Sequence, residues 1–170
     1  MFESFFPKPK VFFFSLAIWV VFLIALWYSV GDRLGQVIGF DLSVSEPVIG
    51  LGHFITSEFL WFDTYYLLGT LGFYFFWRRH SAHVWQNWSV LGSALLIYLS
   101  YASVQVSVVI NAWYGPFYDD IQKALSGNGA IPASQIYDHF IVFCTIAFPY
   151  IAFIIANRFF TSHFIFRWRT

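Results

Sequence analysis

The chain has 170 residues, of which 59% are hydrophobic, 24% aromatic and only 11% charged, with nine basic and nine acidic side chains in balance. A soluble domain carries about 25% charged residues, so this composition excludes an ordinary water-soluble fold and gives no reason to expect a nucleic-acid partner. The single cysteine, Cys144, excludes a disulfide framework or a cysteine-based zinc site within one copy.

Four apolar segments follow one another along the chain, at residues 11–30, 59–77, 88–110 and about 139–156. Crossing the hydrocarbon of a bilayer takes about 17–25 helical residues, and only helices satisfy their own backbone groups in lipid. The first segment is longer than the about 7–15 apolar residues of a signal peptide, so we expect it to be retained. The sequence therefore predicts an all-α membrane protein with four transmembrane helices.

The charged residues divide between the two sides that this topology defines. The N-terminus, the loop at residues 78–87 and the C-terminus carry seven of the nine basic residues, namely Lys8, Lys10, Arg78, Arg79, Arg158, Arg167 and Arg169, against Glu3 alone. The other eight acids are Asp32, Asp41, Glu46, Glu58, Asp63, Asp119, Asp120 and Asp138, and they lie on or near the opposite side. Because basic residues in short loops mark the cytoplasmic side, both termini are predicted to be cytoplasmic.

The two outer segments differ in character. Residues 31–57 are rich in glycine, serine and acids, and although Gly31, Gly35 and Gly39 have a spacing that can pack helices, we interpret this stretch as a flexible loop. The second segment begins where the third apolar run stops, and it contains a Gly115-Pro116 pair that predicts a break in the helix. A short amphipathic stretch, a break at residues 127–129 and a new helix capped at Ser134 are expected to follow.

The third apolar segment has a polar stripe. Six side chains fall on one helical face, at Ser89, Ser93, Ser100, Ser103, Ser107 and Asn111. Small hydroxyl residues allow close helix packing, which is their more common use, or they line a wet cavity. Ser100, Ser103 and Ser107 are therefore candidate cavity-lining residues, with close packing as the alternative.

Chemistry-bearing residues are sparse within the apolar segments. Asp63, near the outer end of the second, is the only ionisable side chain in that span, and a headgroup position is its simpler interpretation. The five histidines form no evident metal or haem pair, and the sequence contains no phosphate-cradling glycine loop, nucleophile elbow or HExxH motif. We therefore expect no enzyme activity, no cofactor or metal, and no nucleotide bound by this chain.

Several short motifs follow one another in order along the chain. They are Ser4-Phe5-Phe6-Pro7-Lys8-Pro9; Trp85-Gln86 and Trp88-Ser89; Asn111-Ala112-Trp113-Tyr114 with Pro116-Phe117-Tyr118-Asp119 and Ile121-Gln122; and Phe166-Arg167-Trp168-Arg169-Thr170. Together these motifs resemble the SbmA/BacA family of bacterial inner-membrane peptide transporters. The resemblance implies a homodimer in the lipid bilayer, with part of an ABC-exporter-like membrane domain and no ATPase domain. It also implies uptake of peptides such as microcins, driven by the proton gradient.

Members of that family continue beyond an Arg-Trp-Arg-Thr segment, so the resemblance implies that these 170 residues are the N-terminal part of a transporter membrane domain, incomplete by itself. The glutamates to which proton coupling is attributed in the family have no counterpart among Glu3, Glu46 and Glu58. Two alternatives remain open. One is the membrane portion of a related ABC transporter with a separate ATPase domain, and the other is a free-standing four-helix accessory membrane protein.

The motif match selects two groups of candidate site residues. The outer end of the third helix supplies residues for gating or peptide contact, with an interfacial aromatic belt as the alternative role. They are Asn111, Trp113, Tyr114, Phe117, Tyr118, Asp119 and Gln122. On the cytoplasmic side, Arg167, Trp168 and Arg169 are expected to anchor the chain at anionic headgroups or to take part in coupling.

Overall fold

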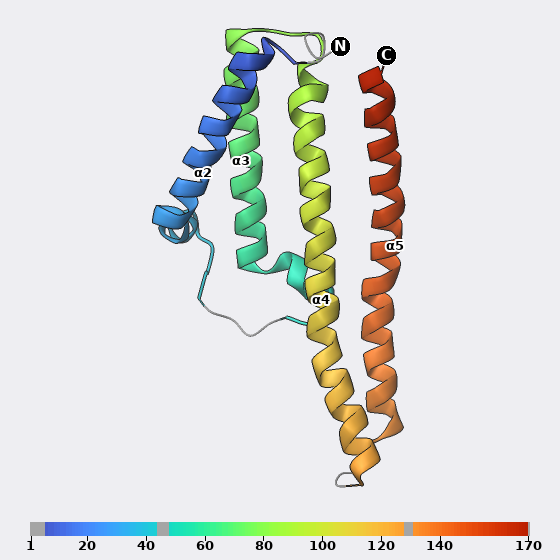
Figure 1. Cartoon of the computed structure of the whole chain (residues 1–170). Coiled ribbons are helices and arrows are strands. Elements are labelled where there is room, and N and C mark those ends of the chain that lie inside the picture. Colours follow the sequence, from blue (N-terminus) through green and yellow to red (C-terminus); the bar gives the residue numbers. More distant parts are fainter. Residues whose placement is uncertain (1–5, 44–47, 128–130, 170) are drawn as a thin grey trace. The chain divides into compact units, whose positions relative to one another are not determined.

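The structure is a computed structural model that describes residues 6–43, 48–127 and 131–169, without the side chain of Trp168. Across these residues the chain is helical, with no strand. Its long helices are α2 (Pro9–Ile38), α3 (Ser57–His80), α4 (Ser93–Ser126) and α5 (Ala133–Arg169). A 3-10 helix, η1 (Leu51–Ile55), precedes α3, and a π-helical turn, η2 (Asn87–Gly92), leads into α4 (Figure 1). The all-helical prediction is confirmed for this part of the chain.

Three helices in the described part of the chain are long and apolar enough to cross a membrane: Pro9–Ile38, Asn87–Ser126 and Ala133–Arg167. Helix α3 coincides with the predicted segment at residues 59–77, but it is not among the three. It begins with an acid at Glu58, contains Asp63 and ends at Arg78, Arg79 and His80. A membrane crossing by α3, the cytoplasmic placement of both termini and the ABC-exporter-like arrangement therefore stay predictions.

Helix α2 extends to Ile38, well past the predicted end at residue 30, so the interpretation of residues 31–38 as a flexible loop was wrong. Gly31 and Gly35 are buried within it, and a Cβ added to Gly35 would lie only 3.0 Å from Nε1 of Trp61 in α3. The absence of a side chain at Gly35 thus admits the bulky Trp61 ring. Gly39 ends the helix in the left-handed conformation at φ 105°, with its N–H donating to the Gln36 and Gly35 carbonyls.

Helices α4 and α5 are also longer than their apolar runs. Helix α4 continues past residue 110 to Ser126, with Pro116 inside it, and the predicted break at Gly115-Pro116 was therefore wrong. Gly127, at φ 68°, follows α4, while the rest of the predicted break, at residues 128–129, lies outside the described residues. Helix α5 begins at Ala133 rather than after a cap at Ser134, and it continues through Pro149 to Arg169, beyond the predicted 139–156.

The lengths of these helices decide where their ends lie. At about 1.5 Å per residue, α4 and α5 are each roughly 50–55 Å long, whereas the hydrocarbon core of a bilayer is about 30 Å thick. The apolar parts of both helices suffice to cross the core. Both helices are therefore longer than a crossing requires, and the end of α4 lies beside the start of α5, where polar side chains of the two helices meet.

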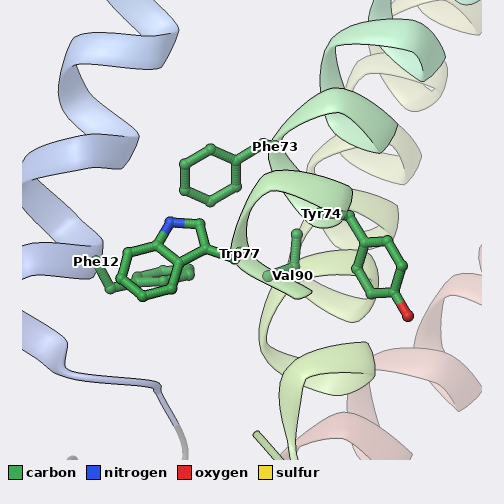
Figure 2. Close-up of a cluster of buried hydrophobic side chains, with 5 residues drawn as sticks. All are labelled: Phe12, Phe73, Tyr74, Trp77 and Val90. Atoms are coloured by element: carbon green, nitrogen blue, oxygen red, sulfur yellow. The ribbon is translucent and has the colours of Figure 1, made fainter. Parts of the chain in front are cut away.

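The chain divides into two compact units, which share α4 and α5. The first comprises Met1–Val44, Ser57–Ile97 and Thr161–Thr170, and its core lies between α2, α3 and η2. Trp77 is fully buried there, with its ring 5.3 Å from that of Phe12 and its Nε1 donating to the Ser15 hydroxyl at 3.1 Å. Figure 2 shows Phe12, Phe73 and Trp77 together on one side of α3, with Tyr74 on the other side.

The second unit comprises Ser45–Thr56 and Tyr98–Phe160. Its core is aliphatic, with Val106 and Val109 of α4 packed against Ile146 of α5. Phe54 of η1 packs against this cluster, and the ring of neighbouring His53 is 3.0 Å from the amide oxygen of Gln105. These contacts hold α4 beside α5. The polar end of the pair follows this aliphatic cluster.

Candidate functional site at the end of helix α4

The seven residues selected at the outer end of the third helix all lie in α4, on two different faces. Trp113 and Phe117 face α5, together with Asp120, which follows them at helical spacing. The other members of the set are exposed, namely Asn111, Tyr114, Tyr118, Asp119 and Gln122. The structure therefore separates a face that packs from a face that is available for contact.

Trp113 is the centre of the packed face. Only 5% of its surface is exposed, and its indole Nε1 donates a 2.9 Å hydrogen bond to the backbone carbonyl of His139 in α5. Its ring stacks on Phe117, with centroids 4.7 Å apart, and packs against Phe143 at 4.9 Å. A tryptophan buried with its N–H satisfied is a structural anchor between two helices.

Asp120, one turn beyond Phe117 and about two turns beyond Trp113, joins the same face through polar contacts. Although it is a carboxylate, only 8% of its surface is exposed. Its Oδ2 accepts a hydrogen bond from the Gln135 side-chain amide at 2.6 Å and lies 2.9 Å from Nε2 of His139, while Oδ1 is 3.6 Å from the Lys123 ammonium. Both carboxylate oxygens thus have neighbours that offset the loss of water around a buried charge.

These contacts explain why α4 continues through Pro116. A proline inside a helix removes one backbone hydrogen bond and crowds the preceding turn, which is why the sequence predicted a break. Here Trp113 before the proline and Phe117 and Asp120 after it all contact α5. The helix pair is therefore held on both sides of the proline, and tertiary contacts outweigh the local preference.

The exposed face carries a second aromatic pair. Tyr114 and Tyr118 stack with ring centroids 5.7 Å apart and an interplanar angle of 21°, yet 41% and 54% of their surfaces remain exposed. Asp119 is exposed beside them. An exposed aromatic pair next to a carboxylate offers both apolar stacking and an anion to a passing ligand.

The predicted polar stripe contributes little to this site. Ser103 donates to the Leu99 carbonyl at 3.1 Å, and Ser107 donates to the Ser103 carbonyl at 3.2 Å, so both hydroxyls bond to their own helix. Ser100 and Ser107 are exposed and Ser103 is half-buried. A cavity-lining role for these serines stays a prediction.

The second selected group, at the end of α5, belongs to the first unit. The Arg167 guanidinium carbon lies 5.5 Å from the ring centroid of Trp88, and the ring of His163 packs against the same tryptophan at 5.4 Å. Arg169 is exposed, whereas the side chain of Trp168 lies outside the described residues. Arg167 is thus tied to η2 by a cation–π contact, and its coupling or anchoring role stays a prediction.

Sequence reasoning missed three residues of this site: Asp120, Gln135 and His139. A signal was present, because Gln135 and His139 are four residues apart in a helix and so share one face. What the sequence could not supply was the register between α4 and α5, which brings that face to Asp120.

Several apolar helices with polar, aromatic ends define a multi-pass membrane protein. The model of the SbmA/BacA-like family matches residues 82–170, which is more than half of the chain. The chain therefore belongs to the SbmA/BacA-like family, a family of the peptide-transporter type, and the resemblance noted in the sequence is confirmed. The matched region contains all of the residues selected in α4 and α5.

Proposed function

We propose that the chain is part of a transporter that imports peptides across the bacterial inner membrane, working as a homodimer and driven by the proton gradient. The observation that carries the proposal is the family match over residues 82–170, which includes the entire polar end of α4. Neither an ATPase domain nor a bound nucleotide is required, since the gradient supplies the energy.

The division of α4 into two faces assigns separate roles within this function. The packed face, with Trp113 and Asp120, sets the spacing between α4 and α5. The exposed face offers the Tyr114–Tyr118 pair to the side chains of an incoming peptide. Tyrosine suits such contacts because its rigid ring buries a large area at low cost in conformational entropy.

Electrostatics favour basic peptides at this end. Asp119 and Asp138 are exposed in the same unit, and Asp120 lies between them in the chain, whereas Lys123 is the only basic residue between Arg79 and Arg158. If this end is periplasmic, as the distribution of basic residues predicts, its negative potential raises the local concentration of cationic peptides.

The test is peptide uptake in cells. The complete transporter of which this chain is proposed to be part is expressed in a bacterial strain that lacks its own peptide-uptake transporter, and sensitivity to a cationic proline-rich antimicrobial peptide is measured. We expect sensitivity to return, and we expect a protonophore to stop uptake of a fluorescent form of the peptide. Unchanged resistance, with the protein present in the membrane at normal levels, would contradict the proposal.

A further inference from the structure

A polar pocket of about 210 Å³ lies in the first unit, where α3 ends and the chain enters η2. It is lined by Tyr74, Arg78, Ala82, His83, Val84, Gln86 and Asn87. None of the residues discussed at the end of α4 takes part in it. The pocket lies in the loop predicted to face the cytoplasm, where the headgroups of anionic lipids and soluble phosphates are both present.

The positively charged side chain of Arg78, which lines the pocket, is held in position. The Arg78 guanidinium donates to the Tyr74 hydroxyl at 3.2 Å and lies 6.0 Å from the centroid of the same ring. That hydroxyl in turn donates to Oδ1 of Asn87 at 2.7 Å. Because only one of these hydrogen bonds is made by Arg78 to Tyr74, most of its five N–H groups remain available to an anion.

Two further lining residues, His83 and Gln86, also make hydrogen bonds. Gln86 is buried, and its amide donates to the Tyr74 carbonyl at 3.0 Å. The backbone N–H of Trp85 donates to Nδ1 of His83 at 3.2 Å, so in the neutral ring the hydrogen is on Nε2. His83 is thus a second hydrogen-bond donor in the wall of the pocket, arranged before any ligand arrives.

Charge decides which ligand fits. The sequence from residue 64 to residue 118 contains no aspartate or glutamate, while Arg78 is followed directly by Arg79 and His80. A guanidinium held in position, within a stretch of sequence that has no aspartate or glutamate, attracts an anion. Arginine recognises phosphate through paired N–H···O bonds, which favours a phosphate over a simple halide.

We propose that this pocket binds a phosphate group, with Arg78 as the charged contact and His83 as a second hydrogen-bond donor. The phosphate of an anionic phospholipid headgroup and free phosphate share this chemistry. A site of this kind would fix the end of α3 at the membrane surface, which goes beyond the transport function and does not depend on it.

The experiment uses the purified chain in zwitterionic nanodiscs, with native mass spectrometry to count bound lipid and isothermal titration to measure inorganic phosphate. The probes are phosphatidylglycerol, phosphatidylcholine and inorganic phosphate. We expect retention of phosphatidylglycerol over phosphatidylcholine, and Arg78→Gln should weaken that retention roughly tenfold, as expected for loss of a charge-assisted contact. Arg79→Gln is the matched control, since Arg79 does not line the pocket.

A second variant keeps the proposal testable if Arg78→Gln misfolds. Asn87→Asp preserves the acceptor for the Tyr74 hydroxyl and adds a negative charge to the wall, so it should abolish binding while leaving thermal stability unchanged. Phosphate binding that shows the same dependence on Arg78 without a lipid preference would assign the site to a soluble phosphate. Equal effects of Arg78→Gln and Arg79→Gln, or no binding of either phosphate probe, would overturn the proposal.

Discussion

The two compact units are stabilised by different chemistry, although both use tryptophan as an anchor. In the first, Trp77 is fully buried among Phe12 and Phe73, and its N–H bonds to a side-chain hydroxyl. In the second, Trp113 bonds to the backbone of α5, and a buried carboxylate, Asp120, lies about two turns away. The difference indicates that the first unit is centred on packed aromatic rings, whereas the second adds a buried carboxylate whose contacts depend on exact partners.

This comparison predicts the largest loss of stability in the first unit. Trp77→Ala leaves a cavity between α2 and α3 that surrounding rings fill only in part, so we expect a loss of about 3 kcal/mol or more. Thermal unfolding in nanodiscs measures it. Phe75→Ala, an exposed aromatic in the same helix, is the control and should change the melting temperature little. Equal effects of the two variants would remove the distinction between scaffold and surface in α3.

In the second unit, the next largest effect is expected at Asp120. Asp120→Ala leaves Gln135 and His139 without their common acceptor, so the end of the α4–α5 pair should open at a lower temperature. Hydrogen exchange of backbone amides at residues 117–126 and 133–142 would report the opening locally. Asp119→Ala removes an exposed acid from the next position and should leave exchange unchanged. An equal increase in hydrogen exchange in both variants would mean that the negative charge, rather than the buried contacts of Asp120, stabilises the end of the helix pair.

A smaller change removes one hydrogen bond and part of one buried ring. Trp113→Phe keeps an aromatic ring against Phe117 and Phe143 but loses the bond to the His139 carbonyl, at a cost of about 1 kcal/mol. Tyr114→Phe, on the exposed face, is the comparison and should lower the free energy of unfolding by less. If the two substitutions cost the same in thermal unfolding, the packed and exposed faces of α4 are not distinct.

The smallest effect is expected in the polar stripe. Ser107→Ala removes a hydroxyl that bonds only to its own helix, so stability should change by less than about 0.5 kcal/mol. Measured together with peptide uptake, this variant separates two roles of the stripe. Lower uptake at unchanged stability would favour a wet path along α4, and unchanged uptake would leave the stripe as a packing surface.

The helical class, the approximate positions of the four helices and the family all followed from the sequence, because apolar length and short motifs are local features. The ends of the helices did not. Pro116 predicts a break from local sterics, but Trp113, Phe117 and Asp120 hold the helix to α5 across it. Likewise, Gly31 and Gly35 look like loop residues until Trp61 of α3 is placed beside Gly35.

The candidate site shows the same limit. The motif selected Trp113 and Tyr118 together, because a motif match does not say which face of a helix packs against a neighbouring helix. Only the register of α4 against α5 separates the anchor from the exposed ring and adds His139 and Gln135 to the site. Residues brought together across two helices are the part that a single sequence does not specify.

The most direct test of the two-face assignment measures uptake and stability on the same variant. In Tyr114→Ala/Tyr118→Ala, both exposed rings are removed while the contacts of Trp113 and Asp120 with α5 remain. We predict a melting temperature close to that of the unsubstituted protein and uptake of the fluorescent cationic peptide reduced roughly fivefold or more. Unchanged uptake at equal membrane levels would contradict a peptide-contact role for the exposed face of α4.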